Sequence, residues 1–448
     1  MKRSIFLSLF ALFFCANFAL AQTEPSSQEV LTIDQCISIA LRNNYDVKAA
    51  EKNYDRAKYG FLGTWEGFFL PKVGLSYSGN RYRYDQEQVY RAKELVGDTL
   101  VDVAYHYRYQ SSYKLGLSFS QTIFDGWNNV ANYNYYKKGK FSAGENLRLT
   151  RQSVILGVKN NCYALLKAQM LLGVQTEAVK RSVEQLNMAK AKYDLGSASL
   201  SDYLKAKVQL SNDSLALITA QNDIKLAEAD LNDIMGRNVD TPIQIDAKLE
   251  YKKFDLSAYS MTEGTIENHP QMNITKSAVD QAHSRLTMAR STNFPNISFG
   301  VNYSWSDTKF PKSWVDYQKP NDPWYVGVQI SLNLFNGLST LSNIWSAQAN
   351  LQAVKEKLIN DRRGIKLEIN KAFLAITEAE QKIRVTEDAL KSAEEDLNLT
   401  QEKYNLGAAS MLELLDANYS YTTAKSNQVQ SLYDFNLAVA QFEKAIGK

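Results

Sequence analysis

The sequence predicts an internally duplicated protein of mixed α and β class, in which very long helices are combined with a small number of β-strands. Its eight prolines are unevenly placed along 448 residues and leave two long helical regions uninterrupted. Several short motifs recur at one constant offset. A pair of alternating apolar segments precedes each long helical region, and alternation with period two is the signal of a strand.

The two helical regions are much longer than ordinary globular helices. Proline is absent from residues 72–241 and from residues 324–448. Within these stretches, residues 127–195 and 338–406 are rich in Ala, Leu, Lys, Gln and Glu, which are good helix formers. At ~1.5 Å per residue each helix would be about 100 Å long. Helices of that length need lateral partners, so the sequence predicts a coiled coil or a helical bundle.

The recurring motifs define a duplication. Phe-Asp-Gly at 124–126 recurs as Phe-Asn-Gly at 335–337, and the Lys-Tyr-x-Leu-Gly run that ends at Gly196 recurs ending at Gly407. Gly236 recurs as Gly447, and all three pairs share an offset of 211 residues. We therefore predict two structural repeats joined by a linker. The first repeat is expected at 22–236, the linker at 237–258 and the second repeat at 259–448, with return helices at about 199–236 and 410–446.

Each repeat should contribute two strands, at about 72–84 and 105–124 in the first and at about 296–306 and 324–335 in the second. One face of each strand is apolar and the other is rich in Gly and Ser. The apolar face could be the core face of a soluble sheet or a face toward lipid. Flanking aromatic residues and long polar loops at 85–102 and 306–323 favour lipid. The flanking aromatics are Tyr82, Tyr84, Tyr105, Tyr107, Tyr109, Trp305, Trp314 and Trp324.

Four strands from one chain cannot close a barrel by themselves. An open sheet edge in lipid would leave its N–H and C=O groups without partners, and small closed barrels need about eight strands. The strand count therefore predicts an oligomer without fixing its order.

The first residues predict export. Lys2 and Arg3 precede an apolar run, and a small-x-small site ends at Ala21, which is the arrangement of a cleaved signal peptide over residues 1–21. Cleavage there would remove Cys15 and leave two distant cysteines, Cys36 and Cys162, which we interpret as small core residues rather than a disulfide framework. No later stretch reaches ~18 consecutive apolar residues, so no transmembrane helix is predicted.

Composition and motifs argue against an enzyme and against a nucleic-acid partner. The chain has 51 Lys and Arg against 48 Asp and Glu, and this near-neutrality does not suit a polyanionic partner. Its three histidines, His106, His269 and His283, have no metal-ligand spacing. No phosphate loop, nucleophile elbow or zinc-protease motif is present, so we predict neither cofactor nor bound metal.

Both long helices end in the same motif, Tyr-x-Leu-Gly-x-x-Ser-x-x-acidic. In the first repeat it comprises Tyr193, Leu195, Gly196, Ser199 and Asp202, and in the second Tyr404, Leu406, Gly407, Ser410 and Glu413. Together with the runs at 40–44 and 266–270 and the Leu-Pro and Phe-Pro pairs before the strands, this duplicated order resembles the TolC family of outer-membrane efflux and secretion channels. The resemblance covers about residues 31–447.

The resemblance implies a homotrimer in a Gram-negative outer membrane, with four strands from each subunit in one twelve-stranded transmembrane β-barrel. The helices would form an α-helical tunnel across the periplasm. Such a protein is the exit duct of a tripartite efflux or type I secretion system. Its partners would be a periplasmic adaptor, an inner-membrane transporter and outer-membrane lipid. Drugs, metal ions and polypeptides remain open as its substrates.

The tip motif also has local physical meaning. Gly196 and Gly407 suit the left-handed residue after a helix, and Ser199 and Ser410 suit N-caps with an acidic residue three positions on. Capping could be the sole role of those acidic residues. The resemblance instead implies that carboxylates at this place line a pore aperture, and that the remaining motif residues form the tip turn and adaptor-docking region. The aperture candidates are Asp202, Glu413 and Asp416.

Two departures from the family pattern affect the tip. Ala198 and Ala409 occupy the positions where the family can place a gating arginine, so that latch is not expected in the same form. Lys205 stands where the first repeat would match Asp416, so an acidic ring would come mainly from the second repeat.

Two other functions remain alternatives. A periplasmic coiled-coil adaptor also has long helical hairpins, but it would have one hairpin between compact β domains rather than a duplicated pair. A barrel-anchored structural spacer with no conducting lumen would share the same helices and strands.

Overall fold

A computed structural model describes residues 29–67, 70–254, 263–310 and 324–447. The predicted signal peptide, Cys15, Trp314 and most of the predicted loop 306–323 lie outside the described residues. The chain divides into two compact units, and each unit takes segments from both predicted repeats. Unit 1 contains Met1–Ala49, Leu149–Ile266 and Ile365–Lys448, and unit 2 contains Ala50–Arg148 and Glu267–Gly364.

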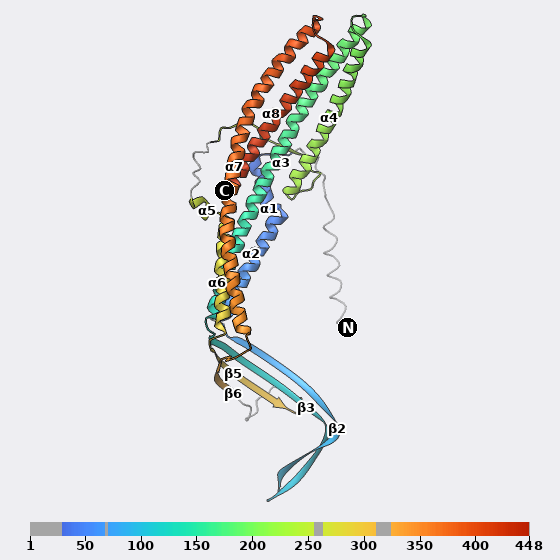
Figure 1. Cartoon of the computed structure of the whole chain (residues 1–448). Coiled ribbons are helices and arrows are strands. Elements are labelled where there is room, and N and C mark those ends of the chain that lie inside the picture. The colour runs from blue at the N-terminus through green and yellow to red at the C-terminus, as the bar shows by residue number, and fades with distance from the viewer. Residues whose placement is uncertain (1–28, 68–69, 255–262, 311–323, 448) are drawn as a thin grey trace, which may run out of the picture. The chain divides into compact units, whose positions relative to one another are not determined.

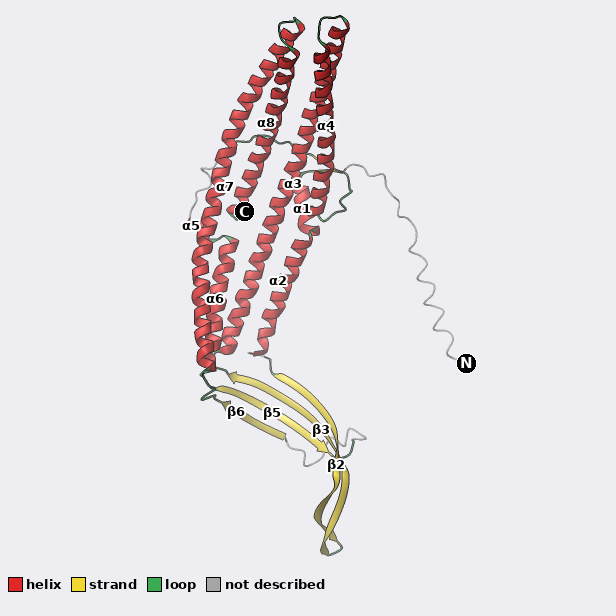
Figure 2. Cartoon of the chain, turned by 45° about the vertical axis from the view of Figure 1, so that its right-hand side comes forward, coloured by secondary structure: helices red, strands yellow, loops and turns green. Residues whose placement is uncertain are grey.

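Two long helical hairpins supply most of unit 1 (Figures 1 and 2), and the first parts of their long helices, up to Arg148 and Gly364, belong to unit 2. The first is made by α3 (Asn128–Asp194) and α4 (Leu200–Ile234), and the second by α7 (Ser339–Asn405) and α8 (Met411–Ala445). The long helices each have 67 residues and the return helices each have 35. Corresponding helices begin and end at positions that differ by the offset of the sequence repeat, so the duplication extends to the bounds of the helices.

Polar contacts tie α3 to α8 in antiparallel order. Lys159 Nζ lies 2.6 Å from Glu443 Oε2, and Lys425 Nζ lies 2.5 Å from Glu177 Oε2. Closer to the hairpin tips, Arg181 Nε donates to Asn418 Oδ1 at 3.2 Å. As the α3 residue number rises, the α8 number falls, so the two hairpins are packed side by side along unit 1 as the predicted bundle requires.

The amino-terminal part of unit 1 is anchored by an element that the sequence pattern did not reveal. Strand β1 (Glu29–Leu31) pairs in parallel with β4 (Ile243–Ile245), which lies inside the predicted linker. Helix α1 (Ile33–Asn43) follows and begins with a capping box between Thr32 and Gln35. Part of the predicted linker therefore forms a strand, which pairs with β1.

Unit 2 contains a four-stranded antiparallel sheet in the order β2-β3-β5-β6. Its strands are β2 (Lys72–Val96), β3 (Thr99–Phe124), β5 (Asn296–Asp307) and β6 (Trp324–Ser331). The structure corrects the predicted bounds of the first hairpin. Most of the expected loop 85–102 is strand, because β2 and β3 continue to a tight turn at Gly97, whose φ is +66°. In the second hairpin β6 ends at Ser331 rather than near residue 335.

The apolar residues of the edge strands β2 and β6 are exposed in the single chain, whereas β5 is mostly half-buried and its Trp305, expected among the flanking aromatics, is fully buried. Val73 pairs with Phe119 and Leu75 with Leu117, so the alternating apolar residues of neighbouring strands share one face of the sheet. The two edge strands, β2 and β6, each have a partner on one side within the sheet. Among the described residues, no helix is both long enough and apolar enough to cross a membrane.

Helices flank the sheet along the chain in unit 2. They are most of α2 (Tyr45–Gly63), the short 3₁₀ helix η1 (Thr64–Gly67) and α6 (Pro270–Ser291), whereas α5 (Glu263–Glu267) lies almost wholly in unit 1. Helix α6 packs on the first part of α7 through Ala282, Leu286 and Leu351. It also contacts the first part of α3, where Lys138 and Asp280 form an ion pair at 2.8 Å.

Candidate functional site

The tips of the two helical hairpins form the candidate site, and both turns have the same backbone design. Gly196 and Gly407 have φ angles of +72° and +78°. In the first turn the N–H of Gly196 donates to the carbonyl of Tyr193, and the N–H of Ser197 donates to that of Lys192. The second turn repeats both bonds, which are the paired bonds of a Schellman motif. The left-handed glycine predicted at each tip is therefore present.

Each return helix starts with a capping box. The N–H of Asp202 donates to Ser199 Oγ at 3.1 Å, and the N–H of Glu413 donates to Ser410 Oγ at 3.3 Å. In return, each acidic side chain accepts from the N–H of its serine. The Ser410 backbone and hydroxyl groups lower the pKa of Glu413, because both donate to its carboxylate. Asp202 and Glu413 thus help to cap the first turns of α4 and α8.

Replacing Gly407 with Ala should destabilise the tip turn by about 1–2 kcal/mol, because a Cβ is strained at positive φ. Gly173 is a matched control: it lies inside α3, and an added Cβ meets nothing within 4 Å at either glycine. Gly173→Ala should be neutral or stabilising, since Ala is the better helix former. Thermal unfolding followed by circular dichroism should give opposite shifts for the two variants. Equal shifts would contradict the turn assignment.

The two tips are joined by a shared apolar cluster. Ala189 from α3, Ala206 from α4 and Leu414 from α8 are buried together. Tyr404, near the end of α7, joins them and is only 5% exposed. The four helix ends therefore pack as one unit rather than as two independent hairpins.

A single lysine links the end of α3 to the end of α7. Lys192 Nζ donates to the carbonyl oxygen of Tyr404 at 2.6 Å and lies 3.9 Å from the centre of the Tyr404 ring. The first contact is a charge-assisted hydrogen bond and the second is a cation–π interaction. Burial raises the pKa of Tyr404, and the nearby Asp202 carboxylate adds to the effect. A polar link between the hairpins therefore exists although Ala198 and Ala409 replace the arginine of the family pattern.

The candidate aperture residues differ in their surroundings. Glu413 and Asp416 are exposed and lie three positions apart on α8, so they share one face of that helix. Asp202 is half-buried, and Lys205 is exposed one turn further along α4. Whereas the corresponding pair in the first hairpin is Asp202 and Lys205, the structure thus brings two exposed carboxylates onto one helix face in the second hairpin. Their role in an aperture stays a prediction.

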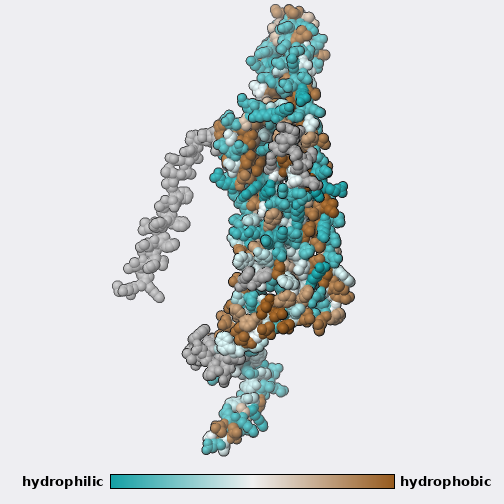
Figure 3. Space-filling model, turned by 90° about the vertical axis from the view of Figure 1, so that its left-hand side faces the viewer, coloured by the Kyte–Doolittle hydropathy of each residue, from teal (hydrophilic) through white to brown (hydrophobic). Residues whose placement is uncertain are grey.

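An apolar groove runs between α4 and α8 beside the tip. Its volume is about 610 Å³, and Leu200, Leu204, Val208, Leu412 and Leu415 supply most of its lining, with Ser201, Lys205 and Gln209 at its edges. Beyond it, Leu195 and Leu406 are 82% and 85% exposed at the turns themselves. Apolar patches interrupt the hydrophilic surface of the helices on the face shown in Figure 3.

The predicted docking residues therefore fall into two groups. Leu195 and Leu406 point into solvent, while Tyr404 is buried in the contact between hairpins. Tyr193 stacks on Tyr203 with ring centroids 6.3 Å apart. No sequence pattern indicates the role of Lys192, because that role depends on the tertiary packing. The groove was not predicted either, although Leu200, Leu204 and Val208 follow each other at intervals of about one helical turn and could have indicated it.

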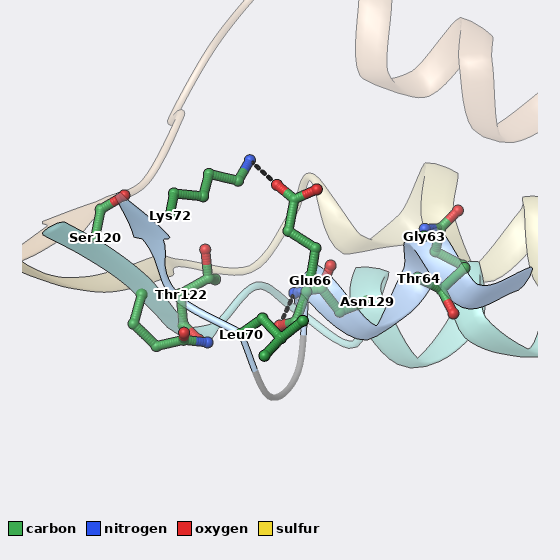
Figure 4. Close-up of a pocket in the computed structure, with 11 residues that line it drawn as sticks. Gly63, Thr64, Glu66, Leu70, Lys72, Ser120, Thr122 and Asn129 are labelled. Carbon is green, nitrogen blue, oxygen red and sulfur yellow. Dashed lines mark hydrogen bonds and ion pairs between the residues drawn. The ribbon is translucent and has the colours of Figure 1, made fainter. Parts of the chain in front are cut away.

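A second concavity lies in unit 2 where η1 meets β2 (Figure 4). Its volume is about 360 Å³ and its lining is mainly polar. Lys72 Nζ lies 2.8 Å from Glu66 Oε1, and Asn129 Nδ2 donates to the carbonyl of Gly67 at 2.9 Å. Within the part of the chain that the structure describes, no group of three or more His, Cys, Asp or Glu side chains could hold a metal ion.

Comparison with known proteins identifies the family. The family described as "Outer membrane efflux protein" matches residues 36–237 and 263–448. Outer membrane protein TolC of Vibrio cholerae is 24% identical over 347 residues, which cover 74% of this chain and 76% of that protein. The alkaline protease secretion protein AprF of Pseudomonas aeruginosa is 23% identical over 411 residues, covering 90% of this chain and 82% of that protein.

The fold agrees with these matches. The crystal structure of the outer membrane protein VceC from Vibrio cholerae superimposes with a TM-score of 0.77 at 16% identity, covering 93% of this chain and 96% of that one. The predicted mixed fold and the resemblance to the TolC family are thereby confirmed. The chain belongs to the outer membrane efflux protein family.

Proposed function

We propose that three copies of this chain form an outer-membrane exit duct for a tripartite efflux or type I secretion system. The family places the chain in the outer membrane. Among its relatives, AprF is named for protease secretion and TtgC of Pseudomonas putida for an efflux pump. The observation that carries the proposal is an open four-stranded sheet with an exposed apolar face, which needs further strands to close in lipid.

Exposed apolar stripes on the helices support assembly with further copies. On α4, beyond the groove at the tip, they include Leu215, Ile218 and Leu226, and on α7 Leu367 and Leu374, seven residues apart. A contiguous apolar stripe on a helix normally packs against a partner. Three subunits with four strands each supply twelve strands, enough for a closed barrel, while the stripes would pack α4 and α7 of neighbouring subunits into a tunnel.

The groove at the tip supports the proposed adaptor partner. It is apolar, solvent-facing and bounded by two parallel walls of helix, which suits the apolar residues of a helical hairpin. Lys205 at its edge can add charge complementarity. An adaptor in this groove would connect the duct to an inner-membrane transporter.

Native mass measurement of the detergent-extracted protein should give a trimer. In planar bilayers the same preparation should conduct ions in discrete steps. A monomer would contradict the assembly. A trimer without conductance would instead favour the structural spacer, and a protein that does not insert into the bilayer would favour a periplasmic adaptor.

A further inference from the structure

The two cysteines of the predicted mature chain meet in unit 1. Cys36 lies on α1 and Cys162 on α3, 126 positions further along the chain, and both are 0% exposed. Both are thiols rather than a disulfide in the structure, and they are close enough to form a hydrogen bond with each other. Figures 1 and 2 show α1 alongside α3 in both views. The sequence interpretation as small core residues holds for their burial but did not place them in contact.

Contacts at both ends of α1 keep the thiol of Cys36 close to that of Cys162. Just before α1, the chain is held by the pairing of β1 with β4. Just after it, Asn44 Nδ2 donates to the carbonyl of Ile234 at 2.9 Å, and Gly236 packs so closely on Asn43 that an added Cβ would lie 2.9 Å from its carbonyl oxygen. Helix α1 is thus fixed at both ends, and Cys36 cannot move far from Cys162 in the folded protein.

We propose that Cys36 and Cys162 are joined by a disulfide that fastens α1 to the long helix α3. The family places this part of the chain outside the cytoplasm, in a compartment where thiols are oxidised. With Cys15 removed, each cysteine has one possible partner within the chain. Among the described residues, neither thiol belongs to a group of side chains that could hold a metal ion.

The reaction is an exchange with the disulfide of a periplasmic thiol oxidant. The thiolate of one cysteine attacks that disulfide, a mixed disulfide forms, and the second cysteine displaces the oxidant. The new S–S bond takes up both sulfurs, and the oxidant leaves as a dithiol carrying the two electrons and two protons. The contact with Cys36 and burial raise the pKa of Cys162 in the folded protein, so the folded thiol reacts poorly. Since both cysteines are 0% exposed in the folded protein, an oxidant must reach them before α1 packs on α3.

Thiol labelling tests the proposal on protein extracted from outer membranes. The sample is denatured with iodoacetamide present, and its mass is compared with that of a sample reduced before labelling. The disulfide predicts no label before reduction and two labels after it, with an unlabelled mass 2 Da below that of the dithiol. Two labels without reduction would overturn the proposal, as would a dimer on non-reducing gels that disappears on reduction.

Cysteine-to-alanine variants distinguish a disulfide from the simple packing of two buried side chains. Cys36→Ala and Cys162→Ala should each leave one thiol that is labelled only after denaturation. Unfolding temperature should fall by the same amount in either single variant and in the double variant, because each removes the same bond. Additive falls would indicate two independent packing defects instead. The double variant should still conduct in bilayers, so this outcome is separate from that of the proposed channel function.

Discussion

Neutralising Glu413 and Asp416 together should reduce the cation-to-anion permeability ratio of the channel about tenfold. The two carboxylates are exposed on one face of α8, and a trimer would bring three copies of the pair around one axis. Converging carboxylates create a negative local potential that concentrates cations and binds multivalent ones. Glu413→Gln with Asp416→Asn keeps side-chain shape and leaves a hydrogen-bond acceptor at the cap. Reversal potentials and block by multivalent cations measure the effect.

A control pair with the same chemistry lies elsewhere on the helices. Glu387 and Asp388 are exposed on α7, well before the tip. Glu387→Gln with Asp388→Asn should leave selectivity and block almost unchanged. If both double variants behave alike, the selectivity comes from the charge of the whole tunnel and the aperture assignment is wrong.

Lowering the pH should reduce the cation selectivity of the tip, because it protonates the Glu413 carboxylate. The folded-state pKa of Glu413 lies below its ordinary 4.5, because Ser410 donates to the charged form. Its capping contribution is therefore present above ~4.5 and is lost as the pH falls through the lowered value. The Glu413 carboxylate should likewise continue to attract cations at about pH 5. With Asp416→Asn in place, so that Glu413 is the acidic group tested, selectivity recorded along a descending pH series should persist at pH 4.5 and decline below it.

Replacing Lys192 with Met should loosen the two hairpins and raise single-channel conductance several-fold. The substitution removes a charged hydrogen bond to the Tyr404 carbonyl and a cation–π contact with its ring, which together contribute roughly 2–4 kcal/mol. Met keeps most of the apolar stem, so the loss is mainly electrostatic. Lys190→Met is the matched control, because Lys190 is exposed and lies one half-turn earlier on α3. Conductance that is equal in both variants would show that Lys192 does not hold the tips together.

The sequence predicted the helices better than the strands. The expected range 127–195 differs by one residue at each end from α3, because a run of helix formers ends at a local signal, a left-handed glycine followed by a capping box. These signals lie within the short segment from Gly196 to Asp202, so the local sequence is enough to predict them. The hairpin of β2 and β3 was underestimated because charged residues interrupt its alternation, and the pairing that continues through them is set by the neighbouring strand.

Tertiary partners could not be read from local patterns. Nothing near Lys192 in the sequence indicates that its ammonium group reaches Tyr404, more than two hundred residues later. The contact between Cys36 and Cys162 could not be predicted from the sequence either, since the spacing of the two cysteines matches no known disulfide pattern. Local chemistry specified the turns and caps of the candidate site, whereas the links between its hairpins depend on how four helices pack.

The parallel pairing of β1 with β4 has a kinetic consequence. Glu29 pairs with Ile243, so β1 cannot pair with β4 until the whole first hairpin has crossed into the periplasm. Loop closure over such a separation is slow compared with helix formation, and non-local parallel pairing delays folding. During export the chain should therefore spend time with preformed helices and an undocked amino-terminal segment. That interval is when holdase chaperones have access to it, and when a thiol on α1 can still be reached.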